Sequence, residues 1–129
     1  NMGKYGITAV KAANLIQQGR VGSPVEVWRS AVATVFPDSK SSREKGCPRD
    51  TFLGLCEEGL VRGIPAGNYT RSRLNKDYAL KAIALLRAHP KSATDPLHLW
   101  QQIVGADKKV HNQQMDVVIT LWGHGFIKK

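Results

Sequence analysis

The sequence predicts an all-α protein of about six helices, arranged as two related three-helix units packed into one compact body. Apolar residues recur at spacings of three and four in several segments, which is typical of amphipathic helices. Capping residues precede these segments and glycines follow them. The pattern of residues 2–64 returns in residues 76–129, with a basic connecting loop at 65–75 between them.

The first two helices have clear boundaries. Residues 5–18 carry small apolar residues at helical spacing, and Gly19 follows as a stop signal. Ser23 is a predicted N-cap because its hydroxyl can accept a backbone hydrogen bond, and Pro24 suits the first helical position. The second helix is therefore expected at 24–35.

Acidic residues mark the starts of later helices. Asp95 precedes a proline in the same way as Ser23 and predicts the helix that carries Trp100. Asp50 and Asp116 are expected to open the third helix of each unit. These helices should end in left-handed glycines, with the following apolar pair folded back onto the core.

Three blocks of residues match between the units, at offsets of 73, 72 and 66. The matched pairs include Tyr5 with Tyr78, Ala9 with Ala82, Trp28 with Trp100, Val32 with Val104, Asp50 with Asp116, Leu55 with Leu121, Gly59 with Gly125 and Val61 with Ile127. The offset falls because the tryptophan-to-aspartate connection is 22 residues long in the first unit and 16 in the second. We interpret Trp28, Trp100, Met115 and Trp122 as core residues rather than as an aromatic binding platform.

The composition indicates an ordinary globular protein with a basic surface. Hydrophobic residues make up 42% of the chain, which excludes a disordered class. The 19 Lys and Arg against 10 Asp and Glu give a net charge of +9, which favours polyanionic partners. No apolar run approaches the ~20 residues that cross a bilayer, and no signal peptide is recognisable, so we expect a cytoplasmic protein without a membrane partner.

The two cysteines match no paired metal or redox spacing. Cys56 lies in an apolar helical pattern and is expected in the core. Cys47 is flanked by Lys45 and Arg49, and nearby cations lower a thiol pKa, so a reactive thiolate stays open as a hypothesis. A disulfide between Cys47 and Cys56 is a further alternative.

Two basic segments of the first unit are the candidate binding sites. The first, residues 36–49, combines cations with small hydroxyl residues and can form an oxyanion cradle or a merely solvated connection. The second, residues 62–76, has no acidic residue and can present an aromatic and several cations from a wing-like excursion. Alternatively, its cations are structural ties to Glu57, Glu58 and Asp77. The candidate anion or nucleic-acid contacts are Lys40, Ser42, Arg43, Lys45, Arg49, Arg62, Tyr69, Arg71, Arg73 and Lys76.

The sequence contains no recognisable catalytic motif. The four histidines show no metal-binding spacing, and the chain has no nucleophile elbow, no dinucleotide turn and no paired acids on one helical face. We therefore predict no catalytic residues, no metal and no cofactor. An enzyme or thiol sensor centred on Cys47 remains an alternative.

Four strings of the sequence resemble an uncharacterised bacterial family of small basic proteins: SSREKGCPR at 41–49, FLGLCEEGLV at 52–61, GIPAGNYT at 63–70 and NQQMD at 112–116. The likeness covers nearly the whole chain. The resemblance implies a compact bacterial protein of a kind carried on mobile genetic elements, and it transfers no catalytic residue.

From these features we expect a non-enzymatic basic module that contacts nucleic acid or another polyanion, such as an acidic protein surface, through its basic segments. A protein-interaction adaptor or a homodimer is the principal alternative. It would be marked by a contiguous apolar patch.

Overall fold

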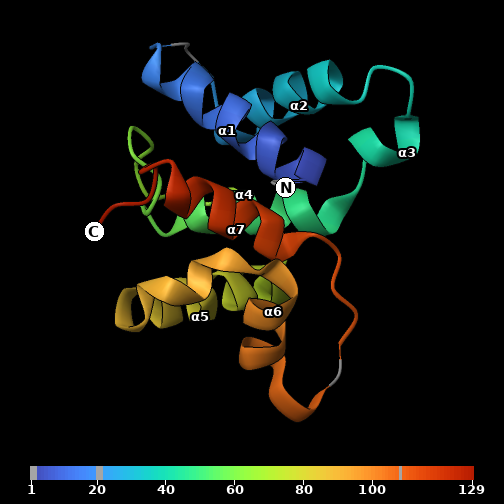
Figure 1. Cartoon of the computed structure of the whole chain (residues 1–129). Helices are drawn as coiled ribbons and strands as arrows, with labels where there is room; N and C mark the ends of the chain where they lie inside the picture. Colours follow the sequence, from blue (N-terminus) through green and yellow to red (C-terminus); the bar gives the residue numbers. More distant parts are fainter. Residues whose placement is uncertain (1–2, 20–21, 108) are drawn as a thin grey trace.

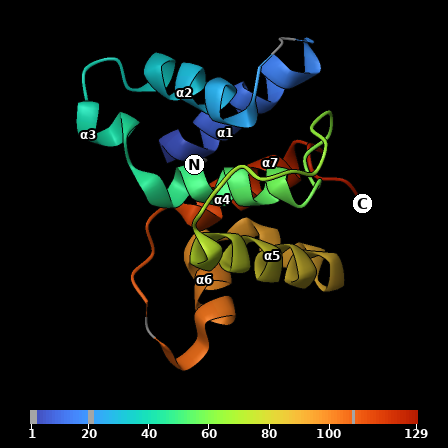
Figure 2. The same cartoon turned by 180° about the vertical axis from the view of Figure 1, so that it is seen from behind.

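The chain folds into three layers of helices (Figures 1 and 2). The structure is a computed structural model that describes residues 3–19, 22–107 and 109–129. One outer layer holds α1 (Gly3–Gln17) and α2 (Pro24–Val35), the central layer holds α4 (Gly46–Glu57) and α7 (Gln114–Gly123), and the other outer layer holds α5 (Arg73–Ala88) and α6 (Pro96–Val104). The shorter elements are α3 (Lys40–Arg43), η1 (Pro90–Thr94) and η2 (Gly105–Asp107). The predicted all-α class with about six main helices is confirmed.

The helices pair across the two units as well as within them. α1 packs against α2 in its own layer and against α7 of the second unit. α5 packs against α4 of the first unit and also touches α7. The first helix of each unit thus lies on the third helix of the other, so each unit completes part of the other's core.

The second helix of each unit begins as the sequence predicted. Ser23 Oγ accepts a hydrogen bond from the backbone N–H of Glu26 at 3.2 Å, and Asp95 Oδ1 accepts one from the N–H of Leu97 at 3.0 Å. A proline is the first residue of both helices, where its missing N–H costs nothing. A hydroxyl and a carboxylate therefore perform the same capping function in the two units.

The third helices of the two units also end alike. Gly59 and Gly125 have φ values of 74° and 76°, in the left-handed region that favours glycine. In both places the next residue donates its N–H to the carbonyl five residues earlier, at 3.0 Å. This geometry satisfies carbonyls that the helix end would otherwise leave unpaired.

An isolated antiparallel β-bridge then joins Val61 to Ile127. Two backbone hydrogen bonds of 2.8 and 3.0 Å flank it, one donated from each side. Both residues are buried, as expected for the apolar pairs that follow the glycines. The bridge therefore connects two positions that match in the predicted repeat.

The core lies on both faces of the central layer. α4 and α7 accordingly bury most of their residues, eight of twelve in α4 and six of ten in α7. Trp28 and Trp100 are 2% and 3% exposed, with the Trp28 ring 5.3 Å from Phe52 and the Trp100 ring edge-on to Tyr78 at 4.8 Å. Cys56 and Met115 are fully buried and Trp122 is half-buried.

The predicted capping role of Asp50 is wrong. α4 begins four residues earlier, at Gly46, because Pro48 fits the first helical turn, where its missing N–H needs no partner. α7 likewise begins at Gln114, so Asp116 is its third residue rather than its cap. The cap of α4, Lys45, makes no side-chain capping bond.

Both basic segments contain more helix than predicted. In the first, Ser39 accepts a hydrogen bond from the N–H of Ser42 at 3.2 Å and begins α3. In the second, Ser72 accepts one from the N–H of Asn75 at 3.3 Å and begins α5, inside the predicted connecting loop. Among the described residues, 62–72 contain turns but no paired strands, so the hairpin form of the expected excursion is wrong. Throughout the described ranges, every helix is too short or too polar to cross a bilayer.

Candidate anion-binding site

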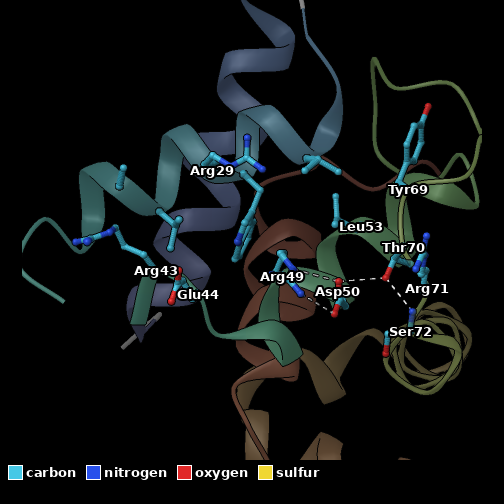
Figure 3. A pocket seen from close by; sticks show the side chains of 14 residues that line it. Arg29, Arg43, Glu44, Arg49, Asp50, Leu53, Tyr69, Thr70, Arg71 and Ser72 are labelled. Atoms are coloured by element: carbon cyan, nitrogen blue, oxygen red, sulfur yellow. Dashed lines mark hydrogen bonds and ion pairs between the residues drawn. The ribbon is translucent and has the colours of Figure 1, made fainter. Parts of the chain in front are cut away.

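A cavity of about 630 Å³ opens between α2, α4 and the segment that leads into α5 (Figure 3). Its apolar wall includes Trp28 and Leu53. Its charged lining consists of four arginines and two carboxylates: Arg29, Arg43, Arg49, Arg71, Glu44 and Asp50. We call this cavity the arginine pocket.

The arginine pocket brings both predicted basic segments together. Arg43 and Arg49 come from the first segment, and Tyr69 and Arg71 come from the second. The folded chain therefore places on one cavity residues whose convergence the sequence left open.

Arg29 completes the arginine pocket from α2 and was missed in the sequence. It is exposed and lies next to Trp28, outside both basic segments. Its matched residue in the second unit is Gln101. A comparison of charge between matched positions would have found Arg29, because the residue that corresponds to this cation in the second unit is neutral.

Arg49 is oriented by its neighbour Asp50. Nε and Nη2 of Arg49 lie 3.3 Å from Oδ1 and Oδ2 of Asp50, and the Thr70 hydroxyl donates to the same carboxylate at 3.1 Å. Figure 3 shows this chain of bonds continuing from Thr70 Oγ1 to the N–H of Ser72 at 3.1 Å. Asp50 thus fixes Arg49 at the pocket and ties α4 to the second basic segment, while the Arg49 side chain stays 40% exposed.

Glu57 holds the second basic segment in place. Its buried carboxylate accepts hydrogen bonds from the backbone N–H groups of Tyr69 at 2.8 Å and Thr70 at 3.2 Å. Lys76 Nζ lies 2.8 Å from it and Arg73 Nη1 lies 3.5 Å from it. The lysine contact and the two backbone donors lower the pKa of Glu57 to about 2. Arg73 and Lys76 therefore serve as structural ties, and Lys76 also contacts Glu58 at 3.2 Å.

Tyr69 is held on three sides. Glu57 binds its backbone, its hydroxyl donates to the carbonyl of Pro65 at 2.8 Å, and its ring lies against Gly67. A side chain on Gly67 would meet the ring, with a Cβ only 2.8 Å from Tyr69 Cζ. The ring is fixed before any ligand arrives.

Other predicted contacts act within the fold. Arg43 Nη1 donates to two backbone carbonyls at the end of α2, both at 2.9 Å, and Figure 3 shows Arg43 turned away from the other arginines. Lys45 Nζ donates to Gln113 Oε1 at 2.7 Å, and Arg62 Nε donates to the carbonyl of Gly125 at 2.9 Å. Arg29, Arg49 and Arg71 are the lining arginines that donate to no backbone carbonyl among the described residues.

The two remaining predicted contacts lie on α3, outside the lining of the arginine pocket. Lys40 is exposed there. Ser42 is half-buried, and its carbonyl accepts a hydrogen bond from the Tyr5 hydroxyl at 3.0 Å. This bond fastens the first basic segment to α1.

The loop after the second helix differs between the units. In the second unit it returns over Trp100, whose Nε1 donates to the carbonyl of Lys109 at 2.8 Å. In the first unit the longer loop is held away by the bonds of Arg43, Lys45 and Ser42, and among the described residues Trp28 Nε1 has no hydrogen-bond partner. Trp28 therefore forms a wall of the arginine pocket, whereas a loop carbonyl covers Trp100.

The cysteines do not contribute to the arginine pocket. Cys47 is the second residue of α4, half-buried and free, and Cys56 lies in the same helix. Nine residues of helix separate them by about 13 Å along the axis, too far for a disulfide. Burial raises the pKa of the Cys56 thiol and keeps it protonated. A reactive Cys47 stays a prediction.

The chain was compared with known proteins. No curated protein and no solved structure matches it. Residues 2–128 match the family described as "Family of unknown function (DUF6979)". Bacterial origin and carriage by mobile elements stay predictions. Because the match spans nearly the whole chain, as the resemblance in the sequence implied, the protein belongs to this family of unknown function.

Proposed function

We propose that this protein is a non-enzymatic binding module that contacts nucleic acid through the arginine pocket. The observation that carries the proposal is the convergence of Arg29, Arg49 and Arg71, from three separate segments, on one cavity. A cytoplasmic location belongs to the same proposal and is supported by the two free cysteines.

The charges of the arginine pocket suit phosphate. The lining contains four arginines and two carboxylates, so it has an excess of positive charge, in a protein whose net charge is +9. Arg presents a planar fork of donors that matches phosphate oxygens in pairs. Arg49 uses Nε and Nη2 for Asp50, which leaves its third guanidinium nitrogen for a ligand.

The large exposed apolar residues give the adaptor alternative less support. Ile7, Leu74, Leu97 and Val110 lie on four different segments, and each is at least 37% exposed. Single apolar side chains on a surface are ordinary and need no partner. The arginine pocket is the more specific feature.

The test is the salt dependence of binding. We expect labelled DNA or RNA oligonucleotides to bind in fluorescence anisotropy, with an affinity that falls steeply as salt rises. The double variant Arg29→Gln/Arg71→Gln should bind more weakly and reduce the slope of log affinity against log salt by about 1 to 2 units.

The matched control is Lys11→Gln/Lys81→Gln, which removes the same charge from exposed positions on α1 and α5 outside the pocket lining. It should leave the slope nearly unchanged. If both double variants lost the same affinity, binding would depend on the net charge of the protein and not on the arginine pocket, which would contradict the proposal. A wild-type protein that binds no oligonucleotide at low salt would also overturn it.

A further inference from the structure

Tyr69 belongs to two adjoining hollows. It lines the arginine pocket and also a second cavity of about 540 Å³ between the end of α1, the start of α2 and the segment before α5. The second cavity has a largely apolar lining that includes Ile16, Pro24, Ile64 and Pro65. A cationic hollow and an apolar hollow therefore meet at one aromatic ring.

We infer that the nucleic acid bound here is single-stranded, with a phosphate in the arginine pocket and a neighbouring unpaired base stacked on Tyr69 toward the second cavity. This inference rests on the proposed function and specifies its ligand. A single strand offers both chemistries side by side: a negatively charged backbone and a flat apolar base.

The fixed ring of Tyr69 supports stacking. Glu57, Pro65 and Gly67 hold its backbone, hydroxyl and ring, so ordering the side chain on binding costs little conformational entropy. Aromatic stacking of this kind is tolerant of base identity. The site is therefore expected to recognise a single strand without strong sequence preference.

Tyr69 and Arg71 are close neighbours in the chain. They are two residues apart, a separation of up to about 7 Å in an extended segment. Thr70 lies between them and bonds to Asp50, which anchors the segment from the other side.

A duplex fits this arrangement poorly. Its bases are paired and stacked inside the helix, so they can stack on an aromatic side chain only after unpairing. The arginines alone would still attract the outer phosphates of a duplex. The structure thus assigns the preference for single strands to Tyr69 and the charge dependence to the arginines.

The experiment compares the wild-type protein with three variants on a short single-stranded homopyrimidine DNA, the matching RNA and a duplex of equal length, by fluorescence anisotropy. We expect the single strands to bind about tenfold or more tightly than the duplex. Tyr69→Ala should weaken single-strand binding by about tenfold and leave the salt slope unchanged, because the ring carries no charge.

Two further variants separate stacking from folding. Tyr69→Phe keeps the ring and loses only the bond to Pro65, so it should retain most of the affinity. Tyr69→Leu keeps apolar bulk without an aromatic face and should behave like Tyr69→Ala. Thermal unfolding by circular dichroism should show all three variants folded.

The outcomes separate the inference from the proposed function. Equal binding of duplex and single strands, or full affinity in Tyr69→Leu, would overturn the inference, and a reduced salt slope in the arginine variants would still uphold nucleic-acid binding. If the wild type bound none of the three oligonucleotides, both would fall.

Discussion

Glu57 is the residue on which the geometry of the candidate site depends most. It binds two backbone N–H groups of the Tyr69 segment and forms an ion pair with Lys76 of α5. A buried carboxylate with this many donors is stabilised in its ionised form. The same residue therefore connects protein stability to the placement of Tyr69 and Arg71.

This predicts an acid-sensitive fold. The pKa of the Glu57 carboxyl is about 2 in the folded protein and about 4.3 in an unfolded chain. Because the folded pKa is lower, ionised Glu57 contributes its stability fully above pH ~4.3, and that contribution is lost as pH falls toward 2. Glu57→Gln should lower the free energy of unfolding by about 2 to 3 kcal/mol at pH 7 and by much less near pH 2.

Urea unfolding of both proteins at the two pH values measures this difference. Glu26→Gln, at an exposed position, is the control and should change stability little. An equal loss for Glu57→Gln at both pH values would show that its ionisation does not matter.

Single residues also show what the sequence can and cannot predict. The caps Ser23 and Asp95 and the glycine turns were predictable because they satisfy backbone groups within a few residues. Asp50 looked like a cap for the same reason, yet its carboxylate binds Arg49 and Thr70. A contact 20 residues away leaves no local pattern, so the pocket role of Asp50 could not be read from its neighbourhood.

Among the helices, the central pair depends on close approach to its neighbours. A Cβ on Gly54 of α4 would lie 2.8 Å from the Cα of Lys76 on α5. In the matched crossing of α1 and α7, the close contact is made by Gly6 on the other helix, against Thr120. Each crossing needs one small residue. In the crossing of α4 and α5 it lies on the central helix α4, and in the crossing of α1 and α7 it lies on the outer helix α1.

We therefore expect Gly54→Ala to destabilise the protein by about 1 to 3 kcal/mol, because backbone rather than a flexible side chain blocks the added methyl group. Gly123→Ala is the matched control, since a Cβ there meets nothing within 4 Å. It should be neutral or stabilising by up to about 1 kcal/mol. Chemical denaturation measures both, and similar effects of the two substitutions would contradict the close packing of α4 on α5.

The helices themselves were largely predictable, whereas their exact starts in the basic segments were not. Periodic apolar residues marked α1, α2, α4, α6 and α7, and the match of Tyr78 and Ala82 to Tyr5 and Ala9 indicated α5. The short helix α3 was not predicted because four residues are too few to show a periodic pattern, although Ser39 is an ordinary N-cap. The early start of α5 at Arg73 had the same kind of signal in Ser72.

In the whole molecule, the two units are interlocked rather than merely adjacent. α1 lies on α7 and α5 lies on α4, and the bridge between Val61 and Ile127 joins the units again. Hydrophobic periodicity predicted which faces are buried, but it carries no information on which distant helix covers them. This is why the sequence predicted two packed units and missed the exchange between them.

The interlocked arrangement predicts that neither half folds as a cooperative monomer. Fragments of residues 1–64 and 65–129, expressed separately, should lack a sharp thermal transition in circular dichroism because each loses a covering helix. When mixed, they should regain the transition and elute as a one-to-one complex in size-exclusion chromatography. A monomeric fragment with its own cooperative transition would show that the exchanged contacts are dispensable.

The loops over the two matched tryptophans are unequal, and under the proposed function this difference predicts how many ligands one chain binds. Two matched units would ordinarily offer two equivalent faces, but a loop carbonyl bonds to Trp100, and of these two tryptophans Trp28 is the one that lines the arginine pocket in the part of the chain that the structure describes. Under the proposed function, we therefore expect each chain to bind one nucleic-acid segment at this pocket. The exposed surface of α6 is then a suitable place for a fluorophore or a fusion, since α6 contributes nothing to the arginine pocket.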